Sequence, residues 1–124
     1  MTSKDNSGLQ NAARWAALAE ANLRIKLGAY SPNLGGACNS RKTHPLIAAM
    51  GYPIWCNRHA EMDLVLRYGG QLEYATVYVA RLLLKDGSLG MAKPCPFCMH
   101  VLSDMGVYRV VWSEGPDTYG EIKL

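Results

Sequence analysis

Two short segments constrain the fold of this chain more than any other feature: HAE at residues 59–61 and PCPFC at residues 94–98. A proline after the first cysteine and a second cysteine three positions on are typical of the first turn of a helix. Imidazole and thiolate are ligands that tetrahedral zinc prefers, and a catalytic zinc site has three protein ligands with the fourth position left for water. The sequence therefore predicts that His59, Cys95 and Cys98 bind Zn²⁺ where two helices begin.

Glu61 lies two residues after the predicted histidine ligand and is not needed as a ligand itself. A carboxylate in that place can carry protons between water and a substrate, so Glu61 is the predicted catalytic residue. Residues two apart on a regular helix point to nearly opposite sides, so His59 and Glu61 converge only where the chain is still entering the helix. Asn57 is the predicted N-cap of this helix, which runs to Tyr68 and stops at Gly69.

The remaining pattern alternates helical and strand-like segments and indicates an α/β protein. In order, we expect a flexible tail (1–8), an amphipathic helix (9–23), a two-stranded hairpin (24–39), a loop (41–55), a buried strand (76–84), a helix capped by Cys95 with Phe97 in its core face, and a strand (107–112). Strand–helix–strand succession implies a crossover between parallel strands, and the hairpin adds an antiparallel pair. The predicted fold is a three-layer α/β/α sandwich with a mixed sheet, formed by residues 9–124 as one domain.

Composition excludes several classes of protein. The chain has 124 residues, of which 49% are hydrophobic and 19% charged, as in an ordinary compact domain. It has no apolar run of roughly 18 residues and no secretion signal, so we expect a cytoplasmic protein without a membrane partner. A formal charge of +3 is too small to indicate a nucleic-acid partner but is compatible with an anionic small molecule. The CxxC spacing favours metal binding or a redox dithiol over structural disulfides, and the upstream HAE weakens the redox interpretation.

HAE followed by PCPFC resembles the zinc-dependent cytidine, deoxycytidylate and tRNA-adenosine deaminase superfamily, over roughly residues 9 to 112. The resemblance implies a cytidine deaminase-like fold, Zn²⁺ as cofactor, and hydrolytic deamination in which Glu61 passes protons to the ring nitrogen and the departing ammonia. It also implies a homo-oligomer in which neighbouring subunits complete each other's pockets. Self-association is favoured as well by a set of large apolar residues that so small a domain cannot readily bury: Trp15, Tyr78, Leu82, Leu84, Tyr108 and Trp112.

Substrate contacts follow from the same resemblance. Asn39 matches the family's asparagine that holds the sugar, although an asparagine at this point can also simply cap the loop. The backbone at Ala60 and Cys95, with Pro94 beside it, would face the base.

Three further residues are candidates for substrate binding. Arg41 and Lys42 would hold a 5′-phosphate through charge-assisted contacts, or else they are solvated surface charges. Trp55 would stack on the base or pack against the beginning of the helix.

The substrate class is the least specific inference. The stretch NSRKTHP before HAE, together with AKPCPFC, resembles small phage-type deoxycytidylate deaminases, so we expect a cytosine nucleotide as the small-molecule partner. The alternative is a tRNA adenosine deaminase, against which Lys93 argues because those enzymes usually carry glutamate before the PC pair. A single-stranded DNA cytosine deaminase lacks support from interleaved basic and aromatic residues. A non-catalytic zinc module would need four protein ligands, and the motifs offer three.

Overall fold

A mixed β-sheet forms the centre of the molecule. The computed structural model describes residues 2–40, 49 and 59–124. The strand order is β2-β1-β3-β5-β6, and β4 pairs with β3 outside this path. β3 and β5 are parallel, whereas every other pair in the sheet is antiparallel. The strands are β1 (Lys26–Ser31), β2 (Gly35–Cys38), β3 (Thr76–Leu82), β4 (Leu89–Gly90), β5 (Arg109–Ser113) and β6 (Tyr119–Lys123).

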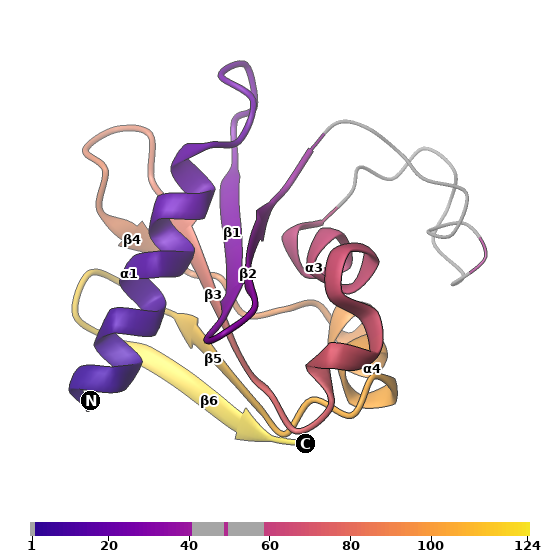
Figure 1. Ribbon diagram of the computed structural model, residues 1–124. Coiled ribbons are helices and arrows are strands. Elements are labelled where there is room, and N and C mark those ends of the chain that lie inside the picture. The colour runs from indigo at the N-terminus through magenta and orange to yellow at the C-terminus, as the bar shows by residue number, and fades with distance from the viewer. Residues whose placement is uncertain (1, 41–48, 50–58) are drawn as a thin grey trace.

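Helices cover both faces of the sheet (Figure 1). α1 (Ser3–Ala17) packs on one face, and α3 (Ala60–Tyr68) and α4 (Pro96–Asp104) lie on the other, with the short 3-10 helix η1 (Gly69–Leu72) following α3. Successive side chains of β3 point to opposite faces. Tyr78 and Ala80 therefore join the α1 cluster, whereas Val77 and Val79 join the α3 and α4 cluster. The predicted three-layer α/β/α sandwich with a mixed sheet is confirmed.

Turn and cap residues gave the most accurate predictions. The hairpin of β1 and β2 is present, α3 ends at Tyr68 with Gly69 at φ 49°, and α4 begins directly after Cys95. The N-cap of α3 is His59 rather than the predicted Asn57, which lies outside the described residues. Phe97 is wrong as a core residue, because 38% of its surface is exposed.

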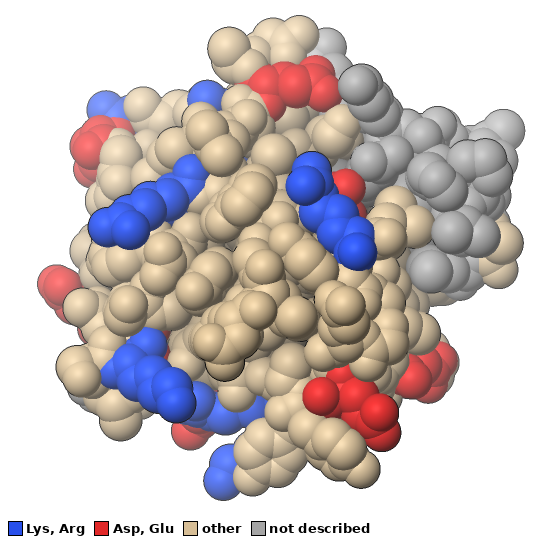
Figure 2. Space-filling view, viewed as in Figure 1, with Lys and Arg blue, Asp and Glu red and all other residues tan. Residues whose placement is uncertain are grey.

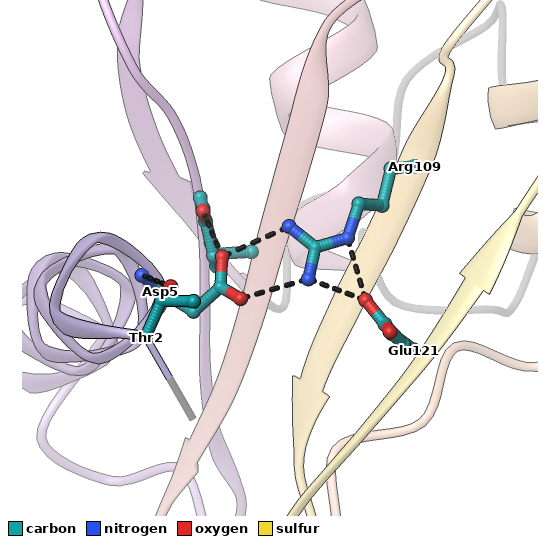
Figure 3. Close-up of polar contacts among 5 residues, drawn as sticks. Thr2, Asp5, Arg109 and Glu121 are labelled. Atoms are coloured by element: carbon teal, nitrogen blue, oxygen red, sulfur yellow. Dashed lines mark hydrogen bonds and ion pairs between the residues drawn. The ribbon is translucent and has the colours of Figure 1, made fainter.

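The predicted flexible tail is wrong for residues 3–8, because α1 begins at Ser3. The hydroxyl of Thr2 caps the helix by accepting a hydrogen bond from the backbone N–H of Asp5, at 3.0 Å. The buried carboxylate of Asp5 accepts hydrogen bonds from Arg109 at 2.9 and 2.8 Å and from the Tyr78 hydroxyl at 2.7 Å. Arg109 also binds Glu121 on β6 (Figure 3). The beginning of α1 is therefore fastened to three strands of the sheet.

Two strands were not predicted, and two apolar residues are more buried than expected. β4 has two residues, and β6 lies in the C-terminal segment that was left without an assignment. Tyr78 and Trp112 are 2% and 5% exposed, because helices cover both faces of the sheet. Neither residue therefore supports the predicted surface for self-association, whereas Leu84 and Tyr108 are exposed. The predicted loop 41–55 lies outside the described residues except for residue 49.

Candidate metal centre

His59 lies at the N-terminal boundary of α3. Its backbone is extended, with φ −72° and ψ 154°, and Ala60 is the first helical residue. The carbonyl of His59 accepts the first hydrogen bond of the helix from the backbone N–H of Asp63, at 3.0 Å. The chain is thus still entering the helix at His59, which is the condition under which its side chain and that of Glu61 can approach each other.

Cys95 has the equivalent position on α4. It is the N-cap, with an extended backbone, and Pro96 takes the first turn, where a missing N–H costs no hydrogen bond. The sulfur of Cys95 accepts from the backbone N–H of Cys98 at 3.5 Å. Cys98 is fully buried and Cys95 is half-buried. Because Cys95 is the N-cap and Cys98 lies in the first turn, both residues lie at the beginning of α4.

The three predicted ligands come together from these two helices. The Nδ1 atom of His59 lies 3.3 Å from the sulfur of Cys98, and the donor atoms of His59, Cys95 and Cys98 all lie within 4.8 Å of one another. Zinc bonds of about 2.0–2.3 Å in a tetrahedral arrangement separate their donor atoms by roughly 3.5 Å. The cluster fits this size and the donor types that zinc prefers. It is the one such group of three in the described part of the chain, and it holds no fourth histidine, cysteine or carboxylate.

Glu61 is buried beside this cluster, with 4% of its surface exposed. Within the described residues its Oε1 atom has no hydrogen-bond partner, which is costly for a buried acceptor and indicates that the atom serves a ligand or a proton. Burial raises the pKa of the carboxyl group. Hydrogen bonds from its own backbone N–H and from Cys98, with the nearby His59 imidazole, oppose that shift. The Glu61 carboxyl group therefore keeps its proton to higher pH than an exposed glutamate does.

The residues predicted to contact substrate divide into three groups. Ala60 and Pro94 are buried and directly adjoin the ligands His59 and Cys95 in the sequence. The amide oxygen of Asn39 accepts from Leu27 N–H at 2.9 Å and its nitrogen donates to the Ile25 carbonyl at 2.8 Å, as expected for the alternative in which Asn39 caps the hairpin. The third group, Arg41, Lys42 and Trp55, lies outside the described residues.

Two other residues near the motifs have partners outside the cluster. His100 is exposed and lies 3.3 Å from the exposed Asp104. The ammonium of Lys93 lies 5.4 Å from the ring centroid of Trp112 on β5. Sequence reasoning missed this link between the segment before Cys95 and β5. A helix cap has a local signal, whereas no local pattern indicates which side chain of a neighbouring strand will meet a loop.

Comparison with known proteins identifies the fold. The chain aligns with the crystal structure of a point mutant of cytidine deaminase from Mycobacterium tuberculosis, with a TM-score of 0.57 and 20% sequence identity. The alignment covers 93% of this chain and 97% of that chain. The chain has the cytidine deaminase fold. No protein-family model and no curated protein matches it.

Proposed function

We propose that this protein is a zinc-dependent hydrolytic deaminase that converts a cytosine nucleotide of the deoxycytidylate type to the uracil nucleotide and ammonia. The observation that carries the proposal is the combination of three zinc-type ligands with a buried carboxylate whose Oε1 lacks a partner within the described residues. A closed structural zinc site would have a fourth protein ligand. The shared fold with a cytidine deaminase supports the same reaction class.

Each residue has a distinct part in this proposal. His59, Cys95 and Cys98 would hold the metal. When bound, zinc would lower the pKa of water to about 7 and so supply a nucleophile for hydrolysis. Glu61 would take the proton of that water and deliver protons to the ring nitrogen and to the amine. The C4–O bond would form first and the bond from C4 to the exocyclic amine would break afterwards, so that water and the cytosine base become the uracil base and ammonia.

We also propose which residues contact the substrate. Ala60 and Pro94, next to the ligands, would face the base together with Trp55, and Asn39 would adjoin the sugar while it closes the hairpin. Arg41 and Lys42 would bind the 5′-phosphate. On the face that Figure 2 shows, Lys and Arg are scattered over broad uncharged surface without a continuous basic stripe, which favours a small nucleotide over a nucleic acid.

Ammonia release tests the reaction directly. Zinc-loaded protein is incubated with cytosine, deoxycytidine, its mono- and triphosphates, a tRNA anticodon stem and single-stranded DNA. We expect release from deoxycytidine monophosphate above all, and release from the tRNA alone would overturn the proposal. Glu61→Gln should keep zinc and lose nearly all turnover, because positioned acid–base catalysis alone contributes about 10²- to 10⁴-fold. The exposed Glu73→Gln is the matched control and should retain full activity.

The phosphate contact has its own test. Arg41→Ala and Lys42→Ala should raise the KM for deoxycytidine monophosphate and leave that for deoxycytidine unchanged, because only the first substrate carries the phosphate. Equal effects on both substrates would remove these two residues from the phosphate site.

A further inference from the structure

Strand β3 pairs with two different strands along one of its edges, and the change of partner lies close in sequence to the segment that carries Cys95. It pairs in parallel with β5 as far as Val79 and Trp112, and it pairs antiparallel with β4 from Arg81 and Gly90. β1 occupies one edge of β3 from Tyr78 to Leu82, so β4 and β5 must share the other edge. β4 ends at Gly90, and the segment that leads to Cys95 follows directly. The junction where β4 and β5 meet along β3 therefore determines the position at which this segment begins.

Ser113 occupies this junction. It is the last residue of β5 and is fully buried. Its hydroxyl donates to the carbonyl of Gly90 at 2.7 Å and accepts from the backbone N–H of Arg81 at 3.3 Å, so it bridges the paired residues of β3 and β4. Its own carbonyl accepts from the backbone N–H of Ala92 at 2.8 Å. Ser113 thus forms hydrogen bonds with both Gly90 and Ala92. Ala92 lies three positions before Cys95.

The neighbouring Trp112 provides a second contact with the same segment. Its ring is 5% exposed and its indole N–H donates to Glu114 at 3.2 Å, so the ring has a fixed orientation. The ammonium of Lys93 lies over that ring, at 5.4 Å from the centroid. The segment between β4 and α4 is therefore attached to the end of β5 by side-chain and backbone contacts before it reaches the ligand.

We propose that Ser113 is a positioning residue for the metal ligand Cys95 and acts through the backbone of residues 90–95. This inference rests on the zinc site of the proposed function. Zinc affinity depends on how closely the free protein holds its donor atoms in the bound arrangement, so loss of a hydrogen bond that supports the segment before Cys95 should weaken zinc binding. Ser113→Ala removes the hydroxyl and leaves the Gly90 carbonyl and the Arg81 N–H without that partner.

The test measures metal binding rather than activity. We expect Ser113→Ala to raise the zinc dissociation constant by about three- to tenfold in a chelator competition, the factor that one buried hydrogen bond typically contributes. Cobalt-substituted protein should show a shifted thiolate-to-cobalt charge-transfer band, because the cysteine geometry changes. Ser113→Thr keeps the hydroxyl and should restore both values. Ser88→Ala is the matched control, since that hydroxyl belongs to the same β3–β4 turn but donates only to Asp86, at 2.6 Å.

A second variant keeps the test decisive if Ser113→Ala does not fold. Lys93→Met keeps the alkyl chain of an exposed residue and removes its charge from the Trp112 ring. We expect zinc binding to weaken by about two- to fivefold, because one exposed cation–π contact typically contributes about that factor. Unchanged affinity in Lys93→Met would then overturn the idea that the end of β5 positions the segment.

The outcomes separate this proposal from the proposed function. Zinc affinity of Ser113→Ala within twofold of wild type overturns the positioning role, as does a lower free energy of unfolding with unchanged affinity and cobalt spectrum. If wild-type protein binds zinc but releases no ammonia, the deaminase proposal is overturned, whereas the proposed positioning role of Ser113 is unaffected. Wild-type protein that binds no zinc overturns both.

Discussion

Replacement of Asp5 by asparagine should destabilise the protein by an amount that the structure lets us calculate. The carboxylate is 6% exposed and accepts hydrogen bonds from Arg109 and Tyr78. Hydrogen bonding to Arg109, with a smaller contribution from Tyr78, outweighs burial and lowers the pKa of Asp5 from 3.8 to about 2. That difference in pKa corresponds to roughly 2 to 3 kcal/mol of stabilisation by the ionised carboxylate, because each pKa unit is worth about 1.4 kcal/mol. We expect Asp5→Asn to lower the free energy of unfolding at pH 7 by this amount.

The pH dependence gives an independent check. The pKa of Asp5 is lower in the folded than in the unfolded protein, so its stabilisation is complete above about pH 4 and is lost as the pH falls towards 2. The stability difference between wild type and Asp5→Asn should therefore be constant from pH 5 to 8 and shrink between about pH 4 and 2. Urea denaturation followed by tryptophan fluorescence measures it. Asp117→Asn, at an exposed position before β6, is the control and should leave stability unchanged.

The reasoning about Asp5 has a clear refutation. If Asp5→Asn unfolds within about 0.5 kcal/mol of wild type at pH 7, the ion pair does not fasten α1 to the sheet. A difference that persists undiminished at pH 2 would show that shape rather than charge is responsible. Deletion of residues 1–8 tests the same point, because a flexible tail would be lost without effect.

Three further predictions follow from the structure. Cys95→Ala or Cys98→Ala should lose zinc itself, measured by elemental analysis of the purified protein, whereas a catalytic variant would keep it. Gly28→Ala should lower the free energy of unfolding by more than about 2 kcal/mol in thermal denaturation, because the added carbon would lie 1.9 Å from the Ala12 carbonyl oxygen of α1. Gly70→Ala, with no heavy atom within 4 Å of the new carbon, should change it by less than about 1 kcal/mol. Sedimentation of the full chain should show a species larger than the monomer, and a monomer at all concentrations would contradict self-association.

The positions of the proposed metal ligands were predictable because their signals are local. Cys95 followed by Pro96 indicates a helix start whatever the rest of the chain does, and Gly69 indicates a helix end. The requirement that His59 precede regular helix followed from side-chain direction alone. The sequence therefore located the start of α4 and, to within two residues, that of α3, and a β-branched apolar run located the central strand.

Long-range pairing explains what the sequence could not predict. Residues 3–8 are polar and resemble a tail, and their order depends on Arg109, which is 104 positions from Asp5. Tyr78 and Trp112 were assigned to a surface for self-association, because no local pattern says which strand side chains the helices will cover. Ser113 resembles any strand-terminal serine, and its role becomes visible only where β3 changes partner.

Stability and metal binding should be separable, because the residues responsible lie at opposite ends of β5. Arg109 begins this strand and Ser113 ends it, which places them roughly 13 Å apart at about 3.3 Å per residue. Asp5 bonds to Tyr78 and Arg109, whereas Ser113 bonds to Arg81, Gly90 and Ala92, so the two sets share no partner.

Substitutions at such distances usually add within about 0.5 kcal/mol. Asp5→Asn should therefore lower the free energy of unfolding of the apo-protein and leave zinc affinity unchanged, and the double variant with Ser113→Ala should bind zinc as weakly as Ser113→Ala alone. Chelator competition on all four proteins measures this. Weaker zinc binding in Asp5→Asn would mean that β5 transmits strain along its length, so that the anchoring of α1 also places the ligand Cys95.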